Sequence, residues 1–523
     1  MPDTSEPVRP RYYVTTPIYY VNDKPHIGHA YTTLACDVLA RFKRLDGHDV
    51  HFLTGTDEHG QKVQQAAEAA GIDPLTFCDG VSRNFRDLAV TLGCTNDDFI
   101  RTTEPRHHAA VTALWQRLRE TGDIYLGEYE GWYSVRDEAF WLESELTDGP
   151  NGTKLAPTGA PVVLTREPSY FFKLSAWGEK LLAFYDQHPD FIGPSSRRNE
   201  VISFVKGGLR DLSVSRTSVS WGIPVPGDPK HTIYVWLDAL TNYMSAVGYP
   251  DITAESYQRF WPANLHMVGK DIVRFHAVYW PAFLLAAGLA PPQRVFAHGW
   301  WTNEGQKISK SLGNVIDPLE LVTTYGLDQV RYFLMREVPF GQDGDFSRKA
   351  LIQRINGDLA NDLGNLAQRS LSMIAKNLDG VMPTPGDFDA EDTAILARMD
   401  GLLADQRRAY DTQEFHIGLT SLWGAIGAVN SYFTAQAPWA LKKTDPARMA
   451  TVLYVTAEAI RQAAILVQPL MPTSAALLLD QLGVAAEARG FDQLGAAGRL
   501  VPGTALPAPQ GVFPRWVDEA PAA

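Results

Sequence analysis

Two histidines and a glycine near the start of the chain have types and spacing suited to phosphate chemistry. They form the motif His26-Ile27-Gly28-His29, and about 0.03 matches to His-x-Gly-His are expected by chance in a chain of this composition. The motif opens a stretch with helical periodicity, and the free N–H groups and dipole of a helix N-terminus attract phosphate. Imidazoles can donate to phosphate oxygens, and Gly28 would let an adenine lie against bare backbone. The alternative is a pair of surface histidines.

A second motif, Lys307-Ile308-Ser309-Lys310-Ser311, follows a turn at 303–305 that contains a glycine. Alone, such a pentamer is most simply a solvated basic loop. Together with the histidine motif it favours another interpretation, because two ammonium groups on a loop can neutralise a departing pyrophosphate as charge builds in the transition state. Lys307 and Lys310 are therefore predicted to be catalytic, together with His26 and His29.

The elements that must position the first motif alternate between strand and helix. They are a strand at 11–20, a helix from His29 to a stop at Gly47, a short strand at 49–53, and a helix at 61–70 closed by Gly71. This order predicts a right-handed parallel crossover, and ligands of such sheets bind at the carboxyl ends of the strands. The loops after Tyr20 and Thr54 are the predicted binding loops.

The rest of the chain predicts an insertion, the return of the sheet and then a helical region. Residues 123–172 are rich in aromatic residues and glycine with turn signals, which is typical of a small β-rich insertion. Strand signals return at 232–237, 265–268 and 295–298, with a helical stretch at 272–284, so the parallel sheet is expected to resume. From 354 to 482 the pattern is amphipathic and helical. The Pro- and Ala-rich end is expected to be an ordered arm or a tail.

The predicted fold class is α/β. It comprises a doubly wound parallel-sheet (Rossmann-like) catalytic domain with a small β-rich insertion, and a C-terminal α-helical bundle. The predicted domains are the first half of the catalytic domain at 1–121, the insertion at 122–226, the second half at 227–300, a linking region with the lysine loop at 301–353, the helical domain at 354–500, and the C-terminal arm or tail at 501–523.

Composition excludes several classes of protein. The 523 residues carry 47 Lys and Arg against 60 Asp and Glu, a net charge of −13, which argues against nucleic-acid binding through a broad basic surface. The three cysteines, Cys36, Cys78 and Cys94, suit a reducing compartment and cannot form a four-cysteine zinc site. The apolar stretch 277–290 is too short to span a bilayer, and the polar start lacks the core of a signal peptide. A cytoplasmic location without membrane contact is expected.

The two motifs resemble the HIGH and KMSKS signatures of class I aminoacyl-tRNA synthetases, with Ile308 in place of the Met of the second. Four further segments look like the methionyl-tRNA synthetase family: Thr16-Pro17-Ile18-Tyr19-Tyr20-Val21-Asn22, Gly55-Thr56-Asp57-Glu58-His59-Gly60, Tyr234-Val235-Trp236-Leu237-Asp238-Ala239 and Val268-Gly269-Lys270-Asp271-Ile272. The likeness runs from about residue 12 to the helices near Met471.

This resemblance implies roles for particular residues. The methionine side chain would contact Ile18, Tyr20, Trp236, Tyr243 and His276, with Asp57 holding the ammonium group. ATP would bind His26, Gly28, His29, Gly269, Asp271 and Lys310, and the tRNA anticodon would contact Asn365, Arg369 and Trp439. Taken singly, each aromatic residue would more commonly be core, and the anticodon set could be one buried Trp and a surface Arg.

The resemblance also implies the reaction and its participants. The expected activity is ATP-dependent activation of L-methionine and its transfer to tRNA(Met), including the initiator tRNA, with Mg²⁺ accompanying ATP and the chain acting as a monomer. A synthetase for isoleucine or valine would need a larger hydrolytic insertion. A cysteine enzyme would need a cluster of metal ligands. A catalytically silent tRNA-binding or scaffolding protein would not need both motifs intact.

The insertion departs from much of this family in its metal chemistry. Many members carry a Cys-x-x-Cys zinc knuckle, whereas the matching stretch here has Ser134 and Asp137, and residues 123–172 contain neither Cys nor His. A tetrahedral structural zinc needs four N or S ligands, so the sequence predicts an insertion without zinc. Packing by Trp132, Tyr133, Phe140 and Trp141 is expected to replace the metal.

Overall fold

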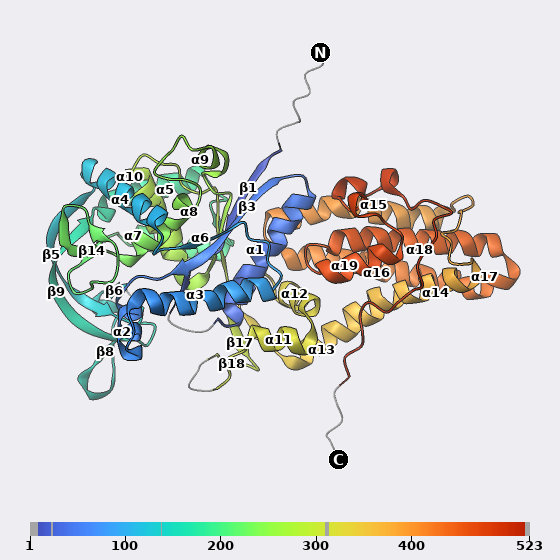
Figure 1. Ribbon diagram of the computed structural model, residues 1–523, viewed down its shortest axis with the longest axis horizontal. Coiled ribbons are helices and arrows are strands. Elements are labelled where there is room, and N and C mark those ends of the chain that lie inside the picture. The colour runs from blue at the N-terminus through green and yellow to red at the C-terminus, as the bar shows by residue number, and fades with distance from the viewer. Residues whose placement is uncertain (1–8, 22–24, 138, 309–312, 518–523) are drawn as a thin grey trace, which may run out of the picture. The chain divides into compact units, whose positions relative to one another are not determined.

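The computed structural model describes residues 9–21, 25–137, 139–308 and 313–517, and it divides into two compact units (Figure 1). The sheet unit contains Arg11–Cys36 and Val50–His298. The helical unit contains Asp37–Asp49 and the chain from Gly299 onward.

A parallel sheet forms the centre of the sheet unit, as the sequence predicts. Its strands run in the order β10-β16-β15-β1-β3-β2, and β4 also pairs with β3. The bounds are β10 Ile192–Gly193, β16 Val295–His298, β15 Leu265–Gly269, β1 Arg11–Thr15, β3 Asp49–Asp57, β2 Tyr19–Tyr20 and β4 Asp98–Arg101. Five of the strand pairs are parallel, namely β1–β15, β15–β16, β10–β16, β2–β3 and β3–β4. The paired strands therefore end at the same edge of the sheet.

The helices of the sheet unit alternate with these strands. They are α1 Ile27–Leu45, α2 Gln61–Ala70, α3 Pro74–Thr91, α4 Pro105–Glu120, α5 Gly178–Gln187, α6 Ser195–Lys206, α7 Val235–Leu240, α8 Asn242–Ser245, α9 Glu255–Phe260 and α10 Trp280–Ala286. A π-helical turn at Phe275–Tyr279 precedes α10. The predictions of α1, of α2 with its left-handed cap at Gly71, and of a helix between β15 and β16 are confirmed.

The first predicted strand is wrong in its length, because 11–20 forms two strands. β1 ends at Thr15 and pairs with β15, whereas β2 pairs with the end of β3. Pro17 lies between them and has no N–H to donate to a continuous ladder. The chain therefore turns at the sheet edge and brings Ile18 out of the strand.

The second predicted strand is too short. β3 continues to Asp57, so the binding loop begins after Asp57 and not after Thr54. Gly55 lies within the strand and allows a close approach of β4, because a Cβ there would lie 2.1 Å from the carbonyl oxygen of Ile100.

The predicted strand at 232–237 is also wrong. The strand β14 covers Asp228–Ile233 and belongs to a separate three-stranded sheet with β12 Ser215–Arg216 and β13 Pro224–Val225. From Val235 the chain is helical, because the backbone N–H of Asp238 bonds to the carbonyl of Tyr234 and starts α7. The run of β-branched and aromatic residues gave the same signal on both sides of this boundary.

The β-rich insertion is confirmed. Its strands are β5 Ile124–Ser134, β6 Ala139–Trp141, β7 Thr147–Asp148, β8 Lys154–Leu155 and β9 Pro161–Phe172, and β5 and β9 run as a long antiparallel ribbon (Figure 1). The rings of Tyr133 and Phe140 lie 4.8 Å apart, and the Arg216 guanidinium lies 4.3 Å from the Phe140 ring centre. Trp132 and Trp141 pack on a small buried cluster around Ala156 and Val162.

The helical unit begins with a small sheet of β17 Trp301–Asn303, β18 Gln306–Lys307 and β19 Gly344–Phe346. Its helices are α11 Pro318–Tyr325, α12 Leu327–Arg336, α13 Arg348–Arg354, a π-helical stretch Ile355–Gly364, α14 Asn365–Asn377, α15 Ala390–Asp411, α16 Phe415–Gln436, α17 Pro438–Thr444, α18 Pro446–Val467 and α19 Pro472–Gln481. The predicted helical bundle is confirmed (Figure 1).

Two features complete the helical unit. Within the described residues, α18 is the one helix long and apolar enough to cross a membrane, and 94% of its most apolar window is buried inside the protein. Packing within the bundle therefore accounts for its composition. The described part of the C-terminal segment is an ordered arm, because Trp516 and Asn356 exchange two hydrogen bonds of 2.7 and 3.0 Å.

A buried ion pair fixes the second half of α1 within the helical unit. The Arg331 guanidinium donates to Asp37 Oδ2 at 2.6 Å and to the carbonyls of Pro469 and Leu470 at 2.9 and 2.7 Å. Both charged side chains are fully buried. Arg41 also reaches Asp37, at 2.8 Å, from a partly exposed position one turn along α1.

We expect Arg331→Met to lower the free energy of unfolding by about 3–5 kcal/mol, because it leaves a buried carboxylate and two carbonyls without this donor. Arg41→Met removes a partner of the same carboxylate near solvent and should cost about 1 kcal/mol or less. Urea denaturation followed by circular dichroism would compare the two. Equal losses would contradict the role assigned to Arg331.

Candidate active site

The histidine motif lies at the start of α1, next to the carboxyl ends of the parallel strands, as the sequence predicts. The rings of His26 and His29 are 3.9 Å apart. The backbone N–H of Gly28 donates to Nδ1 of His26 at 3.1 Å, and the backbone N–H of His26 donates to Nδ1 of His29 at 3.1 Å. A Cβ on Gly28 would lie 2.9 Å from the His26 ring, so the glycine makes room for this fold-back.

This geometry corrects the expectation that free backbone N–H groups await a phosphate here. The N–H groups of His29 and Ala30 both bond to the carbonyl of His26, and that of Gly28 bonds to the His26 ring. The side chain of His26 thus caps the helix in this state. An anion would meet the imidazoles first.

The protonation of the two rings follows from these bonds. A backbone N–H can only donate, so Nδ1 of each histidine accepts, and in the neutral ring the proton is on Nε2. Burial, aided by the neighbouring His26, holds the pKa of His29 well below its usual range. The pKa of His26 is lowered by desolvation, against the opposing effect of Asp271. At neutral pH His29 is therefore an uncharged Nε2–H donor.

Neighbouring strands hold this helix start in place. Thr32 Oγ1 lies 2.7 Å from Nε2 of His298, at the end of β16, and donates to the carbonyl of Gly28 at 3.1 Å. The predicted adenosine residues lie at the end of the next strand, β15. A Cβ on Gly269 would lie 2.5 Å from Oδ1 of Asp271, so the glycine admits this carboxylate.

Three of the predicted methionine residues meet in the interior. Nδ1 of His276 faces the carbonyl of Ile272 at 3.0 Å and so carries the proton, and Nε2 accepts from the hydroxyl of Tyr243 at 2.7 Å. Burial lowers the pKa of His276 to about 4, so this imidazole is neutral. The Trp236 ring stacks on Phe275 at 3.7 Å and meets His276 edge-on at 6.3 Å. The result is an aromatic wall with one fixed polar pair, which suits a thioether side chain.

The other three predicted methionine residues are Tyr20 on β2, Asp57 on β3 and Ile18 in the turn between β1 and β2. Tyr20 pairs with Asp57 in register, and the backbone N–H of Val21 bonds to the carbonyl of Asp57 at 3.3 Å. Asp57 is buried. Ile18 and Tyr20 pack, like Trp236, against the main core of the sheet unit.

The lysine motif falls partly outside the described residues. Lys307 lies at the exposed end of β18, whereas Lys310 lies outside them. The ends of the loop are tied together, because Asn314 donates to the carbonyl of Lys307 at 3.0 Å and Asn303 donates to the carbonyl of Asn314 at 2.9 Å. The described residues on the two sides of the loop are therefore held together.

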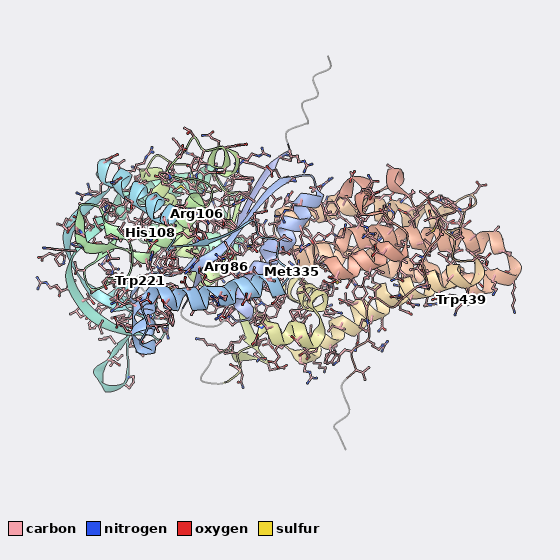
Figure 2. All side chains as sticks on the ribbon, in the orientation of Figure 1. Arg86, Arg106, His108, Trp221, Met335 and Trp439 are labelled. Carbon is pink, nitrogen blue, oxygen red and sulfur yellow. The ribbon has the colours of Figure 1, made fainter. Side chains whose placement is uncertain are left out.

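The predicted anticodon residues gather in the helical unit, where Trp439, labelled in Figure 2, lies on α17. The Arg369 guanidinium lies 5.3 Å from the Trp439 ring centre and 5.1 Å from that of Phe433. Trp439 is 47% exposed, which contradicts the alternative of a buried core Trp. Asn365 lies one turn before Arg369 on α14 and is also exposed.

The structure adds residues that motif reasoning did not single out. Phe275 stacks on Trp236, and His266 stacks on Tyr243 with ring centres 4.0 Å apart. The sequence signal that could have indicated His266 and His298 was their place on predicted strands of the sheet. Gln436 and Arg448 join by a hydrogen bond of 2.9 Å next to the left-handed turn at Ala437 that presents Trp439.

Comparison with known families agrees with this arrangement. The family described as "tRNA synthetases class I (M)" matches residues 12–154 and 151–371, and the "Anticodon binding domain of methionyl tRNA ligase" matches residues 382–523. The parallel sheet, the histidine motif at α1 and these matches define a class I tRNA synthetase.

Individual relatives narrow the class. The chain is 58% identical over 511 residues to the methionine–tRNA ligase of Mesorhizobium japonicum, covering 98% of this chain and 99% of that one. It superimposes with a TM-score of 0.95 and 56% identity on the Mycobacterium tuberculosis methionyl-tRNA synthetase in complex with methionyl-adenylate, covering 97% of this chain and 100% of that one. For the apo form of the same protein the TM-score is 0.89, with 53% identity over 98% and 99% of the two chains. The chain belongs to the methionine–tRNA ligase family.

Because the folded state keeps His276 neutral, the stability of the protein should depend on pH. Below pH 6.5 the unfolded chain binds a proton at this histidine and the folded chain does not until about pH 4. The free energy of unfolding should therefore fall with decreasing pH, by about 1.4 kcal/mol per pH unit for one such group. In His276→Gln this contribution should vanish. Urea denaturation of both proteins from pH 4.5 to 7 measures it, and identical slopes would contradict a neutral His276.

Proposed function

We propose that the chain activates L-methionine with ATP and transfers it to tRNA(Met), including the initiator tRNA. The observation that carries this proposal is the presence of two sites within the sheet unit. One is the pair of imidazoles that start α1, and the other is the aromatic wall with the His276–Tyr243 pair. Membership of the methionine–tRNA ligase family supports it.

In the first step the methionine carboxylate attacks the α-phosphorus of ATP. An O–P bond forms as the bond to pyrophosphate breaks, and since the carboxylate is ionised at neutral pH no general base is needed. Catalysis then depends on positioning and on stabilising the phosphate charge. We assign the phosphate oxygens to Nε2–H of His26 and His29 and to the ammonium groups of Lys307 and Lys310.

The residues of the two pockets take the remaining roles. Asp57 binds the methionine ammonium group, while Ile18, Tyr20, Trp236, Tyr243 and His276 surround the side chain. Gly28, Gly269 and Asp271 contact the adenosine. The groups that the two histidines offer at α1 are N–H donors, which suit phosphate oxygens and not a metal ion. Mg²⁺ would therefore be held through the ATP phosphates, where it would supply further positive charge.

The transfer step uses the helical unit for recognition of tRNA. Trp439 offers a face on which an unstacked anticodon base can lie, and Arg369 and Asn365 offer hydrogen bonds. We propose that the chain acts as a monomer in the cytoplasm and keeps the domain boundaries predicted above.

Methionine-dependent ATP–pyrophosphate exchange tests the activity. With all twenty amino acids compared, methionine should give by far the largest kcat/KM. Exchange without any amino-acid dependence, or a stronger response to isoleucine, valine or cysteine, would overturn the proposal. Charging of tRNA(Met) with labelled methionine then tests the second step.

Trp439→Ala should weaken aminoacylation by raising the KM for tRNA, because a base stacked on an aromatic side chain contributes about 1–3 kcal/mol. Pyrophosphate exchange without tRNA should be unchanged. Ile417→Ala is the matched control. Ile417 is an exposed apolar residue near the start of α16, whereas Trp439 follows the end of that helix. Equal losses in exchange and aminoacylation would make Trp439 structural.

The insertion should contain no zinc. Hydrogen bonds join the residues at the knuckle position, where Asp137 N–H donates to Ser134 Oγ at 3.1 Å and Thr158 donates to the Asp137 carboxylate. Elemental analysis should give far less than one zinc per chain. Stoichiometric zinc, with loss of fold on chelation, would contradict this prediction.

A further inference from the structure

A buried carboxylate next to the proposed methionine site joins two histidines. Asp238 Oδ2 lies 2.6 Å from Nδ1 of His59, and Oδ1 lies 2.7 Å from Nε2 of His107. Nδ1 of His107 in turn lies 2.9 Å from Oγ of Ser245. All four side chains are buried. None of them has a part in the mechanism above.

The direction of the two hydrogen bonds to Asp238 can be assigned. Burial raises the pKa of Asp238, but the two histidines outweigh it and hold the pKa below its usual range, so the carboxylate is ionised and accepts from both rings. The Ser245 hydroxyl has one proton, and carbonyl oxygens of Thr241 and Asn242 lie 3.2 and 3.1 Å from it. Ser245 Oγ lies 2.9 Å from Nδ1 of His107 and closes this end of the polar chain.

The positions of these residues along the chain relate them to methionine. His59, Asp238 and Ser245 each come two residues after a proposed methionine contact, which are Asp57, Trp236 and Tyr243. The three contacts lie on separate elements, namely β3, α7 and α8. The polar chain thus joins positions two residues beyond each of the three contacts.

The segment that carries Asp57 is held on its other side as well. The carboxylate of Glu58 accepts from Arg101 at 2.7 and 2.9 Å, and the carbonyl of Glu58 accepts from the Trp221 indole at 2.5 Å. The His59 ring lies 5.4 Å from that of His108 and 5.6 Å from that of Trp221, two residues labelled in the sheet unit in Figure 2. A shift of His59 must therefore displace its short, restrained segment.

We propose that Asp238, with His59, His107 and Ser245, is a positioning device that sets the distance between the carboxylate that binds the methionine ammonium group and the wall that binds its side chain. His107 extends the device to α4, which supplies none of the proposed methionine contacts. The proposal rests on the proposed function, because it concerns the geometry of that site.

Asp238→Asn tests it with little change in shape. The amide replaces one acceptor oxygen with a donor, which opposes a histidine N–H and forces one ring to change its tautomer or move. In pyrophosphate exchange we expect the KM for methionine to rise about tenfold or more, with the KM for ATP within about twofold of the wild-type value, because small misplacements of binding groups have large effects.

Two further variants make the test specific. Ser245→Ala removes the hydroxyl at the end of the polar chain and should raise the KM for methionine several-fold in the same direction. Ser370→Ala removes a buried hydroxyl of α14 in the helical unit, which supplies none of the proposed methionine contacts, and is the control for loss of a buried hydrogen bond. Thermal melting of each variant reports the general loss of stability.

The outcomes are distinct. Wild-type protein that shows no methionine dependence would overturn the proposed function itself. An active wild type whose Asp238→Asn and Ser245→Ala variants keep the KM for methionine, or change the KM values for methionine and ATP equally, would overturn only the positioning role. If Asp238→Asn does not fold, the KM values of Ser245→Ala decide the matter alone.

Discussion

Burial keeps imidazole side chains uncharged at the carboxyl edge of the parallel sheet, and the arrangement of that edge depends on this constraint. A neutral imidazole has one donor and one acceptor, so each ring needs a fixed partner to settle which nitrogen carries the proton. The backbone N–H of His26 settles it for His29, and a backbone carbonyl settles it for His276. The two rings consequently offer opposite groups to what lies beyond them: Nε2–H at α1 and an Nε2 acceptor towards Tyr243.

The strands provide the rigidity that these assignments need. Parallel strands end at the same edge, so residues distant in sequence meet there without long loops. Glycine permits the closest approaches, as at Gly55 against β4 and at Gly269 against Asp271. The donors and acceptors are thus set before a ligand arrives, which is the arrangement that stabilises charge most effectively.

Much of this organisation could be predicted from the sequence, because it is local. The helix after the histidine motif, the strands β15 and β16, the insertion and the bundle follow from periodicity and turn residues. The errors occur where a tertiary contact decides the outcome. Pairing with β4 and β2 extends β3 to Asp57, and a helical hydrogen bond from Asp238 to Tyr234 ends the apparent strand at 232–237. The fold-back of His26 onto the helix start and the chain through Asp238 join residues that no spacing rule connects.

The central claim is that His29 is neutral and carries its proton on Nε2. Long-range ¹H–¹⁵N correlation spectra of histidine-labelled protein, with His29→Gln used for assignment, test it most directly. We expect an unprotonated Nδ1 and a protonated Nε2 at pH 7, with no change down to pH 6. Two protonated nitrogens at pH 7, or a proton on Nδ1, would contradict the account.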